Sequence, residues 1–262
     1  MKTDQTLRDR LYGRIRRAPS QSSVTNSLPV LFFGDLFSAR IATLGLNPSN
    51  REFVDKNGRE LTGEKRRFET LSSLEAEDRL DLSDAQCERA ICTMRGYFGM
   101  GKQVYNWFAG LDRVTKGMGL CYQLGEVAHL DLVQEATSPT WSRLKKGKPT
   151  EATMMLQLDL PFLQWQLETY SITALICNGK TPSEQILNLL RADRLESGKM
   201  SRVTWFIAAA TVAGRKMAIA GWNIPLAKPT GLGKNGEKRL GRTLAVKMND
   251  IGFRGIRGTP RV

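Results

Sequence analysis

Short apolar runs alternate along the chain with longer segments in which apolar residues recur at helical spacing. The apolar runs have the length and continuity of buried parallel strands, and they cover residues 39–46, 127–133, 174–178, 203–209 and 216–220. Helices are predicted for residues 83–97, 103–111, 152–170 and 182–190, and for a C-terminal segment with Leu240, Leu244 and Met248 on one face. Strands that alternate with helices predict an α/β fold, with a parallel sheet covered on both faces.

The N-terminal segment differs in composition from the rest. Residues 6–17 are basic and helical in character, and residues 20–27 are rich in Ser, Gln and Asn. We therefore expect a basic N-terminal arm and linker at 1–27 and a single domain at 28–262, because no internal repeat divides the chain. No apolar run approaches the roughly 18 residues of a membrane span, and the N-terminus lacks the apolar stretch of a signal peptide. These features favour a cytoplasmic protein with no membrane partner.

Charge adds a class of partner. The chain has 39 basic and 26 acidic residues, a formal net charge of +13 and a pI of about 9.9. Such a field attracts polyanions such as nucleic acid, although charge alone is equally compatible with an inert basic surface. The four cysteines lack CxxC spacing, and His129 is the single histidine, which excludes a multi-histidine metal site. We expect reduced cysteines, no metal and no cofactor.

Polar loops follow the predicted strands, at the edge of the sheet where α/β enzymes place their chemistry. After the strand at 39–46, Pro48 stiffens the turn and holds the amide of Asn47 at the strand end, where it could orient a water. An ordinary Asn-Pro turn is the alternative. Asp131 interrupts an apolar strand and needs a partner if it points inward, and Asn178 ends another strand. His129, taken singly, is more typical of a structural histidine than of a catalyst.

A second basic loop, at 228–234, follows the last predicted strand. Two glycines and a threonine precede a helix there, so main-chain N–H groups could approach a phosphate. The loop matches neither a Walker A sequence nor GxGxxG, which leaves nucleotide binding with little support. A plain loop before a solvated basic helix is the alternative interpretation.

The order of these loops resembles the uracil-DNA glycosylase superfamily. The Gly45–Ser49 turn (GLNPS) is similar to its first motif, and the Lys228–Leu232 loop (KPTGL) is similar to its second, DNA-inserting motif. The resemblance covers residues 28–248, and neither motif alone is diagnostic. It implies a three-layer α/β/α sandwich around a short, mainly parallel sheet. It also implies a monofunctional enzyme without a metal, in which Asn47 positions water for attack on the sugar and an abasic site remains.

The resemblance further implies roles for individual residues. Asn47 would be catalytic, and so would Lys228, by stabilising the departing base or by contacting a phosphate. A nucleotide flipped out of DNA would be bound by Leu46, Ser49, Phe53, Phe68, Asp131 and Asn178, with Tyr97 and Phe98 as further rings for stacking. DNA, the expected partner, would be gripped by Thr230, Gly231, Leu232, Lys234, Lys238, Arg239, Lys145 and Lys146.

Two positions depart from the family pattern. Lys228 stands where uracil enzymes often have His or Asn, and Asp131 stands where uracil-specific members commonly have Asn. An ionised Asp can only accept hydrogen bonds, so it suits the N4 amine of cytosine and repels O4 of uracil. We therefore expect a bulky modified cytosine, such as the glucosylated hydroxymethylcytosine of phage DNA, and a role in anti-phage defence. Uracil repair and a non-catalytic nucleic-acid-binding protein are the alternatives.

Overall fold

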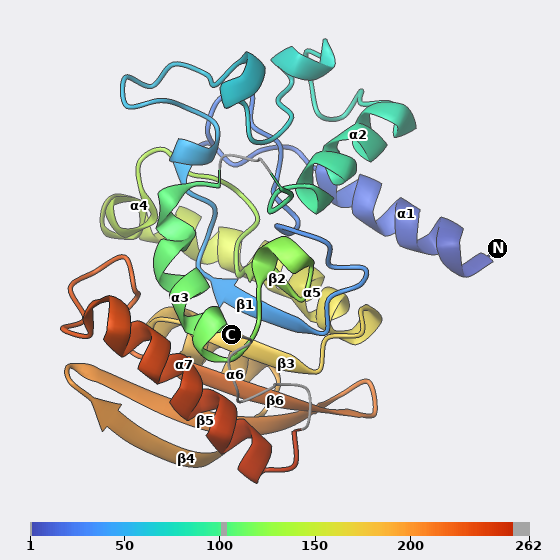
Figure 1. Cartoon of the computed structure of the whole chain (residues 1–262). Coiled ribbons are helices and arrows are strands. Elements are labelled where there is room, and N and C mark those ends of the chain that lie inside the picture. The colour runs from blue at the N-terminus through green and yellow to red at the C-terminus, as the bar shows by residue number, and fades with distance from the viewer. Residues whose placement is uncertain (1, 101–103, 254–262) are drawn as a thin grey trace.

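The computed structural model describes residues 2–100 and 104–253, and its centre is a six-stranded sheet of order β2-β1-β3-β6-β5-β4 (Figure 1). The strands are β1 (Ile41–Gly45), β2 (Val127–Asp131), β3 (Ala174–Asn178), β4 (Asp193–Met200), β5 (Val203–Val212) and β6 (Arg215–Trp222). β2, β1, β3 and β6 run parallel, whereas β5 is antiparallel to both β6 and β4. The prediction of a short, mainly parallel sheet is confirmed.

Helices cover both faces of this sheet. The helices of the described residues are α1 (Lys2–Ile15), α2 (Asp84–Arg95), α3 (Ala109–Gly117), α4 (Trp141–Gly147), α5 (Pro149–Thr169), α6 (Lys180–Leu189) and α7 (Gly233–Asp250). Figure 1 shows α3 and α7 in front of the sheet and α5 and α6 behind it. This arrangement confirms the three-layer α/β/α architecture. None of the helices among the described residues is both long and apolar enough to cross a bilayer.

The register of the central strands aligns their carboxyl ends. All residues of β1, β2 and β3 are buried, as expected of parallel strands with helices on both faces. Gly45 pairs with Asp131 across β1 and β2, and Asn178 pairs with Trp222 across β3 and β6. The loops that follow these four strands therefore lie along one edge of the sheet, where open α/β folds bind their ligands.

Two glycines allow α3 and α7 to pack in very close contact. A Cβ at Gly117 would lie 2.1 Å from the main-chain oxygen of Lys238, and one at Gly241 would lie 2.0 Å from that of Val114. No side chain larger than hydrogen fits at either position, so the helix backbones touch directly. An ion pair between Arg113 of α3 and the buried Glu237 of α7 spans the same crossing.

The N-terminal segment is integrated with the rest of the structure, although the sequence predicts an arm and linker there. Leu11 and Ile15 of α1 are buried in the main core. The stretch after α1 is bound to the loop that follows β2, because Val24 N–H donates to Ala136 O at 2.9 Å. Ser138 N–H donates to Ser22 O at the same distance. The described part of 1–27 is thus packed onto the domain; residue 1, like 101–103 and 254–262, lies outside the description.

Three elements differ from expectation, and one of them is α4, a helix that the sequence analysis did not predict. A helix predicted at 103–111 is in fact a 3₁₀ turn, Asn106–Phe108, followed by α3; residue 103 itself is not among the described residues. The β4 strand was not expected, because its residues are polar and largely exposed. It forms by antiparallel pairing with β5 at the sheet edge, where side-chain burial is not required.

Candidate functional site

A narrow pocket opens at the carboxyl ends of β1 and β2. Its volume is ≈ 30 Å³, enough to hold a water. The wall is formed by the loop after β1, the end of β2, the segment before α3 and the ring of Phe33, which precedes β1 in the sequence. The lining residues are Phe33, Asn47, Pro48, Ser49, Glu52, Tyr105, Trp107, Phe108, His129 and Asp131. The pocket brings together Asn47, Ser49 and Asp131 of the residues predicted from sequence.

The orientation of the Asn47 amide is fixed by its neighbours. Its Nδ2 donates to the main-chain oxygens of Pro48 at 3.1 Å and Glu135 at 3.2 Å, and to Thr137 Oγ1 at 3.2 Å. Because carbonyl oxygens only accept, the group that faces them must be the NH₂. Oδ1 is thereby turned the other way, and none of the described residues donates a hydrogen bond to it. An acceptor held in this manner can receive a hydrogen bond from a water.

Asp131 is a buried carboxylate with incomplete pairing. It is 3% exposed, and its Oδ1 accepts no hydrogen bond within the described residues. Nε2 of His129 lies 3.4 Å from that oxygen, at the long end of an ion-pair contact. The carboxylate fits only because Gly45 lies opposite: a Cβ there would be 2.3 Å from Oδ1. A buried acceptor without a donor is costly, so the site favours a ligand that brings one.

His129 is held from its other nitrogen. Nδ1 lies 2.7 Å from Thr43 Oγ1, which in turn lies 2.7 Å from the hydroxyl of Tyr122. When Thr43 donates to Nδ1, the proton of the neutral ring resides on Nε2, next to Asp131. The rings of Phe33, Trp107 and Phe108 surround the imidazole at centroid distances of 4.9 to 5.4 Å. Phe33 pairs with the outer edge of β2: its main-chain N–H and C=O form hydrogen bonds of 2.9 Å with the main chain of His129.

Glu52 is a second buried acid in the pocket, and the sequence analysis missed it. It is 2% exposed, and both carboxyl oxygens lie 2.9 Å from the hydroxyl of Tyr97. Burial raises the pKa of Glu52 to about 8; Arg67 and the Tyr97 hydroxyl oppose this rise, and Asp131 adds to it. In sequence it is a glutamate in a charged loop, and only its position after the cap formed by Ser49 gives a hint of order.

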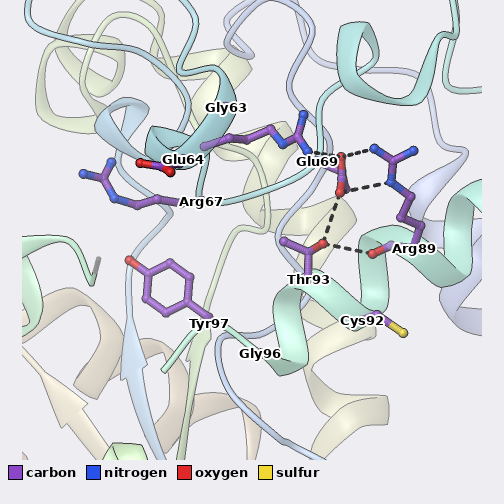
Figure 2. A pocket seen from close by; sticks show the side chains of 10 residues that line it. Gly63, Glu64, Arg67, Glu69, Arg89, Cys92, Thr93, Gly96 and Tyr97 are labelled. Atoms are coloured by element: carbon purple, nitrogen blue, oxygen red, sulfur yellow. Dashed lines mark hydrogen bonds and ion pairs between the residues drawn. The ribbon is translucent and has the colours of Figure 1, made fainter. Parts of the chain in front are cut away.

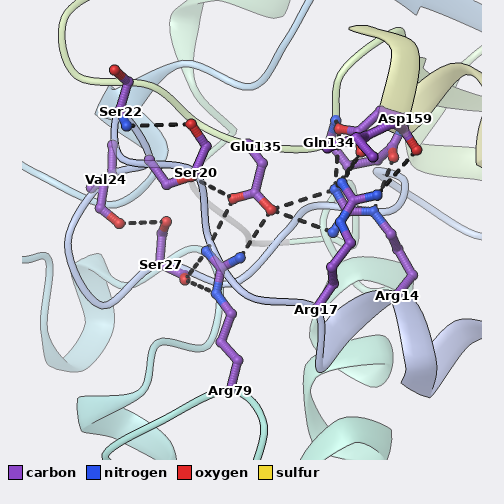
Figure 3. A network of polar contacts seen from close by, with 12 residues as sticks. Arg14, Arg17, Ser20, Ser22, Val24, Ser27, Arg79, Gln134, Glu135 and Asp159 are labelled. Carbon is purple, nitrogen blue, oxygen red and sulfur yellow. Dashed lines mark hydrogen bonds and ion pairs between the residues drawn. The ribbon is translucent and has the colours of Figure 1, made fainter. Parts of the chain in front are cut away.

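A buried network of ion pairs holds the loop after β2, and the Glu135 carbonyl of that loop accepts a hydrogen bond from Asn47 (Figure 3). The carboxylate of Glu135 accepts from Arg79 at 2.9 and 3.0 Å and from Arg14 at 3.3 Å. Arg14 also pairs with Asp159, whose Oδ2 accepts the N–H of Gln134 at 2.8 Å. Burial alone would raise the pKa of Glu135, but Arg79 and Arg14 outweigh burial and lower that pKa. The charged Glu135 thus fixes the main-chain carbonyl that orients Asn47.

The remaining predicted base-binding residues lie outside the pocket. Phe53 and Phe68 are buried in the core, where Phe68 stacks on Tyr97 with centroids 5.0 Å apart. Leu46 packs against a small apolar cluster that includes Val133 and Trp141. Oδ1 of Asn178 accepts from Trp222 Nε1 at 3.1 Å and from Leu226 N at 3.0 Å. Asn178 therefore joins β3 to the loop after β6. The rings that line the pocket are others than Phe53 and Phe68.

The predicted DNA-contacting residues are spread over three segments. Lys228 and Gly231 are exposed in the loop after β6, while Thr230 is buried and its Oγ1 accepts the N–H of Leu232 at 3.3 Å. The exposed basic residues on helices are Lys145 and Lys146 of α4 and Lys234, Lys238 and Arg239 of α7. Lys238 differs from the others because it lines a separate cavity of ≈ 440 Å³ with residues that precede β2, at the amino end of that strand.

A larger cavity adjoins the residues that contact Glu52. It measures ≈ 670 Å³ and includes Tyr97, Arg66, Arg67 and Arg89 in its lining (Figure 2). Glu69 pairs with Arg66 at 3.6 Å and with Arg89 at 3.2 Å. Arg67 donates to Arg51 O at 2.7 Å and lies 4.0 Å from Glu52. Tyr97 and Arg67 are thus shared between this cavity and the surroundings of Glu52.

Comparison with known proteins does not identify a family for this chain. Among the described residues, no group of three or more His, Cys, Asp and Glu side chains is placed to hold a metal ion. The chain matches no protein-family model and is not significantly similar in sequence to any curated protein.

Proposed function

We propose that the chain is a monofunctional DNA glycosylase that removes a modified cytosine and leaves an abasic site. One observation carries the proposal: an amide oxygen of Asn47 and a carboxylate of Asp131, each short of a donor, meet in one pocket at the ligand-binding edge of the sheet. The first suits a water, and the second suits the exocyclic amine of a base.

The base would stack on rings of the pocket wall. A volume of ≈ 30 Å³ admits no pyrimidine, so the pocket must widen when a flipped nucleotide enters. Tyr105 and Trp107 are the half-buried rings of the lining, whereas Phe33 and Phe108 are buried. Tyr105 and Trp107 can therefore move at least cost, and we assign Trp107 as the side chain that stacks on the base.

The chemistry follows from the amide. Oδ1 of Asn47 holds a water that bonds to C1′ of the sugar as the glycosidic bond breaks. An amide is a weak base, so its contribution is to position the water and to stabilise a cationic sugar. None of the described residues that line the pocket is a lysine, and we take water rather than an amine as the nucleophile.

Asp131 directs the choice of base. Its carboxylate accepts from the N4 amine of cytosine and repels O4 of uracil. Ordinary cytosine must be spared, so a bulky 5-substituent has to mark the target, as glucosylated hydroxymethylcytosine does in some phage DNA. The positive charge of the chain, with Lys228 and Lys234 exposed near the same edge, would attract the phosphates of such DNA.

The test is direct incubation with three DNA substrates: uracil-containing, hydroxymethylcytosine-containing and glucosylated phage DNA. Abasic-site formation is measured on each, together with DNA binding. We expect abasic sites in the glucosylated DNA. Abasic sites only in uracil DNA would instead support deaminated-base repair. Binding without abasic sites on any substrate would leave a non-catalytic DNA-binding protein and end the proposal.

A further inference from the structure

We infer that Glu52 is the proton donor to the departing base, acting beside Asp131 as a carboxylic acid–carboxylate pair that reads the edge of cytosine. This inference rests on the proposed glycosylase function and adds to it a second catalytic residue. Glu52 and Asp131 are the two acidic residues of the pocket lining, and both are almost fully buried. Two carboxyl groups in such a site do not both ionise readily, because each charge destabilises the other.

The surroundings of Glu52 can accommodate a protonated acid. Arg67, the cation next to Glu52, lies 4.0 Å away and donates to Arg51 O at 2.7 Å, so its charge compensates Glu52 incompletely. Both oxygens of Glu52 lie 2.9 Å from the Tyr97 hydroxyl, which also accepts the N–H of Tyr105 at 3.2 Å. A phenol can accept from a protonated acid as well as donate to a carboxylate.

The pair matches the hydrogen-bonding edge of cytosine. That edge presents the N4 amine as donor next to N3 as acceptor. An ionised Asp131 accepts from N4, and a protonated Glu52 donates to N3. Uracil has the acceptor O4 in place of the N4 amine, and its N3 carries a hydrogen and donates. Both contacts would therefore be lost with uracil. The pair therefore selects for cytosine-type bases at two adjacent atoms.

The same contact supplies the proton that the reaction needs. The proton of Glu52 passes to N3, and the C1′–N1 bond breaks with both electrons going to the base, which leaves neutral. The water held by Asn47 bonds to C1′, and its surplus proton returns through solvent to the Glu52 carboxylate. One water is consumed, and no oxidant or reductant is required. Protonation of a leaving group by a positioned acid commonly contributes about 10²–10⁴-fold in rate.

The pH dependence of excision follows from this role. Among the described residues, the charged and titratable groups that face Glu52 are Arg67, Tyr97 and Asp131, with His129 next to Asp131 and Tyr105 against the Arg67 guanidinium. Burial raises the pKa of Glu52 to about 8, so the acid form is present at neutral pH. The single-turnover rate of the wild type should fall as the pH rises through about 8, since the proton donor is then lost.

The experiment compares wild type, Glu52→Gln and Glu52→Asp in single-turnover excision from glucosylated phage DNA at pH ~5 to ~9.5. Gln keeps a hydrogen-bond donor but has no proton to transfer, so we expect a rate loss on the order of 100-fold at neutral pH, unchanged DNA affinity and no alkaline fall. Asp should restore part of the rate and the alkaline fall. Glu184→Gln, an exposed site on α6, is the matched control and should behave as the wild type.

The outcomes separate the two proposals. If the wild type forms no abasic sites in glucosylated or hydroxymethylcytosine DNA, the proposed function itself fails. If the wild type is active but Glu52→Gln keeps its rate and its alkaline fall, the glycosylase stands and the role of Glu52 is overturned. The wild-type pH profile decides the matter without any variant, because a rate that stays flat to pH ~9.5 would contradict an acid with the raised pKa of Glu52.

Discussion

Nδ2 of Asn47 donates to the main-chain oxygen of Glu135 at 3.2 Å, while the carboxylate of that same Glu135 is paired with two buried arginines. The arginines come from α1 and from the segment before α2, so residues far apart in sequence hold one amide in place. Orientation of a catalytic group accounts for a large share of rate enhancement, so under the proposed function these buried ion pairs would affect the rate as well as the stability.

Replacement of Asn47 by Ala removes the oxygen that holds the water and leaves the pocket wall otherwise intact. We expect the excision rate to fall by about 100-fold or more, with DNA affinity within about 2-fold of the wild type. Single-turnover excision and a DNA-binding titration check this. Asn188→Ala, on the exposed face of α6, serves as control and should change neither quantity. A loss of binding that matched the loss of rate would point to a role in holding DNA instead.

Arg79→Met tests the support. Arg79 is 1% exposed and donates to Glu135 and to Ser27 O, so the variant leaves a buried carboxylate with part of its compensation gone. Breaking a buried pair from one side costs about 3–5 kcal/mol, and we expect the free energy of unfolding to fall by that order in urea denaturation. Arg95→Met breaks the more exposed pair with Asp35 and should cost about 1 kcal/mol or less. Equal losses for the two variants would argue against the support role.

Gly45→Ala tests the space that Asp131 occupies. The new Cβ would lie 2.3 Å from Oδ1 of Asp131 and 3.0 Å from Nε2 of His129, so the carboxylate must rotate away. Because a side-chain tip gives way rather than the backbone, we expect a modest change in melting temperature but a large loss of excision rate. Gly13→Ala in α1 meets no atom within 4 Å and should add about 0.5–1 kcal/mol of stability without affecting the rate. An unchanged rate in Gly45→Ala would remove Asp131 from the site.

The pH dependence of stability isolates Glu52 from the reaction. Its pKa is about 8 in the folded chain against an ordinary value of 4.5, so between these values the native state holds a proton that the unfolded state has released. The free energy of unfolding should therefore decrease as pH rises across this window. Glu52→Gln has no such proton, and its stability curve should be flatter and lie above the wild type at alkaline pH. Urea denaturation at a series of pH values checks the slopes; identical slopes would contradict the buried acid.

Salt dependence tests the predicted DNA contacts. Each lysine that contacts a phosphate contributes about 0.9 to the slope of log affinity against log salt. The double variant Lys228→Ala/Lys234→Ala should bind DNA more weakly irrespective of sequence and reduce the slope by nearly 2. Lys247→Ala, near the far end of α7, should leave the slope unchanged. A slope that both variants leave unaltered would place the DNA on another surface.

The central strands could be predicted because their physics is local. β3 is a continuous apolar run whose predicted and observed bounds coincide, and Ser83 was a recognisable N-cap that accepts from Gln86 N. β4 could not be predicted, since a polar edge strand gains its order from pairing with β5. The helix at α1 was predicted, but its packing onto the domain was not, because the buried Arg14 meets Glu135 and Asp159 from distant segments only in the folded chain.

Only part of the site could be predicted from the sequence, for a similar reason. Asn47 and Asp131 lie at strand ends, where topology alone predicts that they meet. Glu52 looks like any charged loop residue, because its burial depends on Tyr97 from a segment 45 residues away. Phe53 and Phe68 were predicted to stack on the base but lie in the core, whereas Trp107 and Phe33 come from other segments of the chain and line the pocket.

The contact of α3 and α7 at Gly117 and Gly241 has a mechanical consequence. α3 directly follows the turn that carries Trp107, and α7 directly follows the loop that carries Lys228. Near its start α3 meets that loop again, since a Cβ at Gly110 would touch Leu226. Because the two backbones touch at these glycines, and the Arg113–Glu237 ion pair joins the same crossing, we expect α3 and α7 to move together. If DNA contacts the loop at 228–232, as we propose, a shift of that loop should also shift the pocket wall at Trp107, so that DNA binding and widening of the pocket would be coupled.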